Sequence, residues 1–157
     1  MQKIYHREAL SSLIESARKE GFKVGFANGC FDVLHVGHIR YFQGAKTHCD
    51  VLVVAVNDDA SVRRLKGPGR PLTPLSERME LVAAFQAVDY VTSFGEDTVE
   101  ETLRILKPDI QFKGTDYKPE TVPERHVMTE IGGRVMIVGD PKDHSTTELI
   151  EKIGENT

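Results

Sequence analysis

The sequence has no apolar run long enough to cross a bilayer, and residues 1–7 lack the charged-then-apolar order of a signal peptide. It has only two cysteines, Cys30 and Cys49, too few for a disulfide framework in a chain of 157 residues. Its net charge of −4 argues against binding to nucleic acid through bulk electrostatics. We therefore expect a cytoplasmic protein with reduced thiols, whose partners include neither membrane nor nucleic acid.

Several motifs of phosphate binding and catalysis are missing as well. There is no G-x-x-x-x-G-K-[ST] sequence and no G-x-G-x-x-G after a predicted strand, which argues against a P-loop kinase and a dinucleotide dehydrogenase. Neither a nucleophilic triad nor a paired-carboxylate signature is evident. The chemistry of the protein must therefore rest on other residues.

Hydrophobic residues make up 39% of the chain and charged residues 28%, typical of a soluble globular protein, and the length fits one domain over residues 1–157. Apolar positions at helical spacing alternate with short apolar runs. The spaced positions predict helices over residues 9–19, 36–47, 74–87, 98–106 and 146–153. The short runs predict strands over residues 23–27, 51–56, 90–93, 109–113 and 134–138.

Strands that alternate with helices indicate βαβ units, so the predicted fold class is α/β, a single Rossmann-like domain with a doubly wound parallel sheet. An N-terminal helix at about residues 8–20 precedes a catalytic core at about residues 22–153. Ligands of such sheets bind beyond the carboxyl ends of the strands. The candidate loops are therefore residues 28–38, 57–59, 114–117 and 139–145.

The first of these loops carries two histidines around a glycine. His35 and His38 are three residues apart at a predicted helix start, so they lie on one face of its first turn. Gly37 lets a phosphate approach the backbone, and the unpaired N–H groups of a helix start attract anions. The helix dipole disfavours the charged imidazolium form of these histidines, whereas a bound triphosphate would favour it. A neutral imidazole can still donate an N–H hydrogen bond to charge that develops on a phosphate. The turn is thus predicted to bind phosphate.

Two other interpretations of this loop stay open. A histidine pair at this spacing can be a surface feature without function. Cys30, His35 and His38 are also three potential zinc ligands within nine residues, although no second cluster supplies a fourth ligand.

A cluster of basic residues stands out in this acidic protein. Arg63, Arg64, Lys66 and Arg70 flank a Gly/Pro segment, and we expect them in a mobile loop that closes over substrate. Lys66 is the predicted catalytic cation at the phosphates. The alternative is an ordinary solubilising lysine on the surface.

Two distant motifs together resemble a known family. Gly29-Cys30-Phe31-Asp32 followed by His35-x-Gly37-His38 resembles the signature of the cytidylyltransferase-like nucleotidyltransferases, and Ser145-Thr146-Thr147 resembles the family's Ser-Thr-Thr stretch. The resemblance implies catalytic roles for His35 and His38. It also implies nucleotide binding by Cys30, Phe31, Asp32, Gly37, Ser145, Thr146 and Thr147.

A closer resemblance, from about Phe22 to Ile153, is to the adenylyltransferase domain of heptose-phosphate enzymes. The matching segments are Asn28-Gly29-Cys30-Phe31-Asp32, Ala55-Val56-Asn57-Asp58-Asp59-Ala60-Ser61-Val62, Arg64-Leu65-Lys66-Gly67 with Arg70-Pro71, and Lys113-Gly114-x-Asp116-Tyr117. The resemblance implies that ATP and D-glycero-β-D-manno-heptose 1-phosphate give ADP-heptose and pyrophosphate, for lipopolysaccharide or another surface glycan. The sequence departs from this family at Thr115, usually glycine, and at Lys142 and Asp143.

The nucleophile of such a reaction is a phosphate monoester, which is already anionic at neutral pH. It needs no general base, so the protein has to position the phosphates and neutralise charge at the α-phosphate. We expect His35, His38 and Lys66 to do this together with Mg²⁺, by direct in-line transfer.

The remaining candidates have a structural and a functional interpretation each. Arg78 either reaches the phosphates, as the resemblance implies, or pairs with Glu77 or Glu80. Asp32 either caps the coming turn or orients a lysine or Mg²⁺. Substrate binding is assigned to the loop after residues 109–113, with Lys113 at a phosphate, Asp116 at sugar hydroxyls, and Gly114 between them. Ser145 and Thr146 fit an N-cap of the last helix.

Other functions remain as alternatives. One is a cytidylyltransferase that acts on an alcohol phosphate such as glycerol 3-phosphate, and another is a non-catalytic nucleotide-binding or metal-binding module. The leading hypothesis requires a separate sugar kinase in the pathway, and the resemblance also implies that a homodimer is common.

Overall fold

The computed structural model describes residues 2–140, 150, 151 and 153. The predicted nucleotide-binding residues Ser145, Thr146 and Thr147 therefore lie outside the described residues, as do Lys142 and Asp143 and most of the predicted last helix. Within the described part of the chain, no helix is both long and apolar enough to span a membrane.

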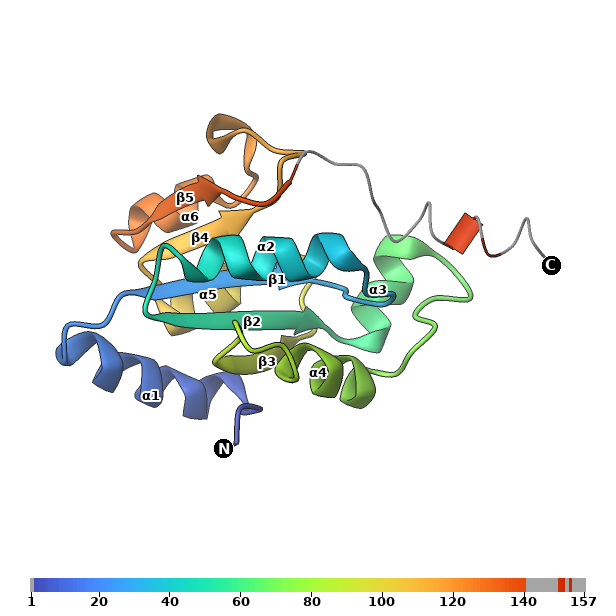
Figure 1. The fold of residues 1–157 in the computed structure, drawn as a ribbon, viewed down its shortest axis with the longest axis horizontal. Helices are drawn as coiled ribbons and strands as arrows, with labels where there is room; N and C mark the ends of the chain where they lie inside the picture. The colour runs from blue at the N-terminus through green and yellow to red at the C-terminus, as the bar shows by residue number, and fades with distance from the viewer. Residues whose placement is uncertain (1, 141–149, 152, 154–157) are drawn as a thin grey trace.

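Five of the described segments form one parallel sheet in the order β3-β2-β1-β4-β5, which confirms the predicted α/β class (Figure 1). The central strands β1 and β2 pair from Val24 with Val51 to Gly29 with Val56. The strands are β1 (Val24–Gly29), β2 (Val51–Asn57), β3 (Tyr90–Phe94), β4 (Ile110–Lys113) and β5 (Arg134–Ile137).

Helices cover both faces of the sheet, and side chains of β2 alternate between the two resulting cores. Val54 and Val56 pack on the face covered by α2 and α4, while Val53 and Ala55 pack on the face covered by α1, α5 and α6. The alternation follows from the period of two in a strand, and it explains why β2 is almost entirely apolar. The helices on these faces are α1 (Arg7–Lys19), α2 (Val36–Lys46), α4 (Leu75–Ala83), α5 (Glu100–Leu106) and α6 (Arg125–Glu130).

The prediction was wrong for the basic cluster, because most of it is helical. A helix, α3 (Asp59–Lys66), follows β2, and it begins where the Asp58 carboxylate accepts a hydrogen bond from Ser61 N at 2.8 Å. Arg63, Arg64 and Lys66 form its last turn, so only Arg70 lies in the loop that follows.

Other differences are short helices and helix ends. The helix α6 and the 3₁₀ turn η1 (Pro119–Thr121) were not predicted, since neither spans two turns of apolar periodicity. The predicted helix over residues 74–87 ends at Ala83 instead, and β1 continues to Gly29.

Candidate active site

A cleft of about 570 Å³ opens at the carboxyl edge of the sheet, above β1 and β4. Its location agrees with the loops predicted to carry the ligand. Predicted site residues from three separate segments line the cleft: Cys30, Phe31, Asp32, His35, Gly37, His38, Lys66, Lys113, Gly114 and Asp116. Of the predicted site residues that the structure describes, Arg78 alone does not line it.

The turn from β1 to α2 is shaped by Phe31. This residue has a left-handed backbone with φ of 49° and a buried ring, which packs edge-on against His38 at 5.6 Å between ring centroids. The same ring contacts Phe42 of α2, at 5.5 Å. Phe31 therefore anchors the turn in the core and sets the position of the histidine ring beside the cleft.

His35 and His38 each accept a backbone hydrogen bond within this turn. His35 N donates to His38 Nδ1 and Gly37 N donates to His35 Nδ1, both at 3.1 Å. The two rings lie 4.2 Å apart between centroids. Because Nδ1 is the acceptor in both rings, a neutral imidazole here carries its proton on Nε2, where it can act as a donor.

The pKa of His38 is lowered from its usual value to about 4. Burial is the main cause, the neighbouring His35 adds to it, and the hydrogen bond from His35 N opposes it in part. His38 is therefore neutral at pH 7 in the free protein. A neutral imidazole suits the stabilisation of charge by an N–H donor.

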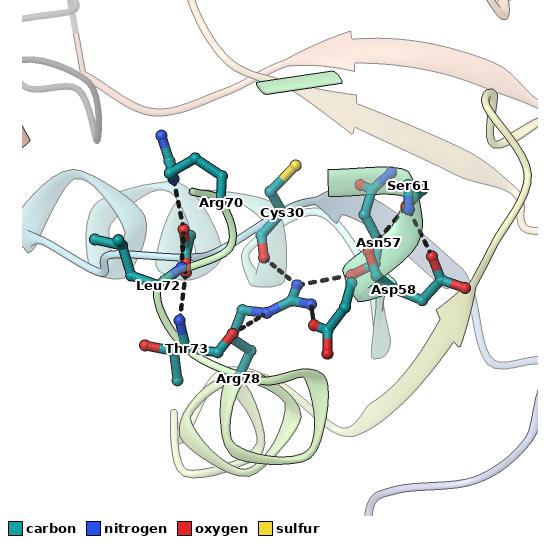
Figure 2. A network of polar contacts seen from close by, with 10 residues as sticks. Cys30, Asn57, Asp58, Ser61, Arg70, Leu72, Thr73 and Arg78 are labelled. Atoms are coloured by element: carbon teal, nitrogen blue, oxygen red, sulfur yellow. Dashed lines mark hydrogen bonds and ion pairs between the residues drawn. The ribbon is translucent and has the colours of Figure 1, made fainter. Parts of the chain in front are cut away.

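Asp32 has a buried side chain and holds the loop after α3. Its carboxylate accepts hydrogen bonds from Arg70 Nε at 2.7 Å and from the backbone N–H groups of Leu72 and Thr73 (Figure 2). Burial raises the pKa of this carboxyl, but the hydrogen bonds from Leu72, Arg70 and Thr73 outweigh burial and lower it overall. Asp32 thus orients an arginine and a loop; the predicted partner was a lysine or Mg²⁺.

Arg78 of α4 has no exposed surface and acts as a clamp between loops. Its guanidinium donates to the carbonyl oxygens of Thr73, Cys30 and Asn57 at 2.7–2.9 Å and to Asp59 Oδ1 at 2.7 Å (Figure 2). Neither Glu77 nor Glu80 is its ion-pair partner, which is Asp59. Arg78 therefore ties the carboxyl ends of β1 and β2 to the start of α4.

Lys66 lies at the end of α3, lines the cleft, and forms no ion pair with a described residue. The charge of Lys66 affects the pKa of the Cys30 thiol. Burial raises this pKa, and Lys66 is the largest of the cationic influences that oppose the rise. Cys30 consequently remains a thiol at neutral pH. Among the described residues no three potential metal ligands lie together, so Cys30, His35 and His38 do not form such a group in this structure.

The opposite wall of the cleft belongs to β4 and β5. Lys113 lies 3.5 Å from Glu124 Oε1 and 5.2 Å from the centre of the Tyr117 ring. Thr115, one of the departures from the family pattern, donates through Oγ1 to Asp140 O at 2.7 Å.

Sequence reasoning missed several residues that line the cleft. Arg40 forms an ion pair with Asp140 at 2.6 Å, and the Tyr41 hydroxyl donates to Phe112 O at 2.8 Å. Tyr41 is three residues after His38, so its place on the same face of α2 could have been read from helical spacing. The pairing of Arg40 with Asp140 spans 100 positions and has no local signal.

Comparison with known proteins gives matches over most of the chain. The family model described as Cytidylyltransferase-like matches residues 26–152. The proteins called bifunctional protein HldE in Syntrophotalea carbinolica and in Trichlorobacter lovleyi are each 48% identical to this chain, over 96% and 98% of its length. The chain spans only 31% of the length of each.

A solved structure is similar as well. The crystal structure of the lipopolysaccharide core biosynthesis protein from Thermoplasma volcanium GSS1 superposes with a TM-score of 0.64 at 31% identity. The match covers 75% of this chain and 95% of that one. This chain, with its parallel sheet and its cleft at the carboxyl edge, is therefore similar both to the HldE proteins and to the lipopolysaccharide core biosynthesis protein.

Proposed function

We propose a specific reaction for this chain, which belongs to the cytidylyltransferase-like family. The chain is a nucleotidyltransferase that transfers AMP from ATP to D-glycero-β-D-manno-heptose 1-phosphate. The products are ADP-heptose and pyrophosphate. The name of the similar structure, a lipopolysaccharide core biosynthesis protein, supports a role in lipopolysaccharide synthesis. As a step that consumes ATP, the proposed reaction belongs in the cytoplasm.

One observation carries this proposal: a single cleft brings the His35-Val36-Gly37-His38 turn and Lys66 together with Lys113 and Asp116 on the opposite wall. The first wall suits a triphosphate, since it offers a helix start, two imidazoles and a lysine. The second wall offers a cation and a carboxylate, which suit the phosphate and the hydroxyls of a sugar phosphate. A nucleotide and an acceptor can therefore meet in one site.

The chemistry follows from these residues. A phosphate oxygen of the sugar phosphate attacks the α-phosphorus, a new P–O bond forms, and the bond from the α-phosphorus to the bridging oxygen breaks. Pyrophosphate leaves with the electron pair of that bond. No proton has to be removed from the nucleophile, because the phosphate monoester is already anionic. His35, His38 in its neutral form, and Lys66 would donate N–H hydrogen bonds to the charge that develops on the phosphate oxygens.

Magnesium enters this proposal as the complex with ATP. The described residues contain no group of three carboxylates or imidazoles that could hold a metal ion, and the buried Asp32 is engaged by Arg70. Mg²⁺ commonly keeps its waters and binds through substrate phosphates with few protein ligands. The phosphates of ATP and water would thus supply most of its coordination.

A panel of four nucleoside triphosphates against several sugar 1-phosphates tests the proposal. ATP with the heptose 1-phosphate should give the highest kcat/KM, with one pyrophosphate per nucleotide sugar. Robust turnover of CTP with glycerol 3-phosphate would instead identify an alcohol-phosphate cytidylyltransferase. Calorimetric binding of ATP without product from any acceptor would indicate a non-catalytic module.

A further inference from the structure

Lys113 is held on the β4 wall of the cleft by two groups of different kind. Its ammonium lies 3.5 Å from Glu124 Oε1 and over the ring of Tyr117, and both the lysine and glutamate side chains are only 11% exposed. Lys113 and Tyr117 line the cleft, whereas Glu124 does not. The carboxylate therefore contacts the cleft only through the lysine.

Glu124 has no evident structural reason to carry a charge. It precedes α6, but its side chain makes no hydrogen bond that caps the helix. Its Oε2 is shielded from solvent and has no hydrogen-bond partner among the described residues. A buried carboxylate oxygen without a partner destabilises a fold, and a buried ion pair is often no better for stability than apolar residues of the same size.

We propose that Glu124 is a positioning residue that holds Lys113 ready for the phosphate of the sugar substrate. The inference rests on the proposed function. A lysine side chain has about four rotatable bonds, and it loses much rotamer freedom when its ammonium is fixed. Glu124 and the Tyr117 ring impose this order before substrate binds, which lowers the entropic cost of binding.

The geometry leaves Lys113 able to bind substrate while it stays paired. The 3.5 Å separation is longer than a close charge-assisted hydrogen bond, and an ammonium has three donors. A phosphate in the cleft can therefore accept from Lys113 without displacing Glu124. Loss of Glu124 should weaken acceptor binding and leave the transfer step on the other wall nearly unchanged.

The test compares steady-state kinetics of the full-length wild-type chain with those of Glu124→Gln and Glu124→Asp. Glu124→Gln should raise the KM for heptose 1-phosphate about tenfold, with kcat and the KM for ATP changed less than about twofold. Glu124→Asp, which keeps the carboxylate, should recover part of the loss. Glu130→Gln is the matched control, since Glu130 lies in α6 and pairs with Arg104 on the surface; its kinetics should equal those of the wild type.

A double-mutant cycle separates positioning from a general effect on folding. In a Lys113→Ala background, Glu124→Gln should change the KM by less than about twofold, because the glutamate acts through the lysine. An unchanged KM in Glu124→Gln, or additive effects in the cycle, would overturn the positioning role of Glu124 and leave the proposed function standing. Should Glu124→Gln fail to fold, Glu124→Asp with a wild-type KM and no coupling to Lys113 would overturn it equally. A wild-type chain without turnover of the sugar phosphate would overturn the proposed function as well.

Discussion

At the scale of single residues, the turn before α2 is ordered by its own histidines. His35 and His38 accept backbone hydrogen bonds through Nδ1, and Phe31 covers one ring. The hydrogen bonds fix the tautomer of a neutral ring, while burial and the neighbouring His35 lower the pKa of His38 to about 4. The site is therefore prepared to donate hydrogen bonds and poorly suited to take up a proton.

The lowered pKa of His38 predicts that wild-type stability falls with acidification. Between its usual pKa of 6.5 and about 4, the unfolded chain binds a proton at this histidine and the folded chain does not. The free energy of unfolding should hence decrease as the pH falls through this window. From pH 7 to pH 5, the wild type should lose about 2 kcal/mol more than His38→Asn, whose amide oxygen can still accept from His35 N.

Urea unfolding followed by far-UV circular dichroism at pH 7 and pH 5 measures this difference. Equal losses in both proteins would show that His38 is protonated in the folded state at pH 5. His126→Asn serves as the control, since that histidine is exposed on α6 beside Glu100.

At the scale of elements, α4 is joined to the sheet through one buried arginine. Arg78 donates to three backbone carbonyl oxygens and to Asp59, so it connects α4 with the ends of β1 and β2 and with the start of α3. These loops carry the turn at Cys30 and the cleft residue Asn57. The arginine thus shapes the nucleotide side of the cleft without lining it.

Arg78→Lys should lower the free energy of unfolding by about 3 kcal/mol or more, because one ammonium cannot reach four acceptors that a guanidinium spans. Arg64→Lys, which alters the half-exposed pair with Asp97, should change it by less than about 1 kcal/mol. Equilibrium urea denaturation of the two variants provides the comparison. Equal effects would mean that the buried network contributes little.

The sequence predicts the elements with strong periodicity and fails where long-range contacts decide. The apolar run of β2 and the stripe of α1 both indicate their structure, since burial on a sheet leaves a local pattern. The short helix α3 depends on the Asp58 cap, and its basic residues resemble a loop. The ion-pair partners of Asp32, Arg78 and Lys113 lie 38, 19 and 11 positions away, so no local pattern reveals them.

At the scale of the whole molecule, an acidic chain presents cations around one cleft. The net charge is −4, yet Arg40, Lys66, Arg70 and Lys113 all line the cleft. Arg40, Arg70 and Lys113 are paired with carboxylates, whereas Lys66 forms no ion pair with a described residue. The charge of Lys66, which no ion pair with a described residue offsets, therefore favours an anionic ligand at this site.

Formation of ADP-heptose by the wild-type chain and by His35→Ala tests the central claim most directly. With ATP, Mg²⁺ and heptose 1-phosphate, the wild type should release ADP-heptose and pyrophosphate in equal amounts, measured by mass spectrometry and a coupled pyrophosphate assay. His35→Ala should retain the fold and lose on the order of 100-fold in kcat, as expected when a donor to developing charge is removed. No ADP-heptose from the wild type, or an unchanged kcat in His35→Ala, would contradict the assignment of this cleft as the site of adenylyl transfer.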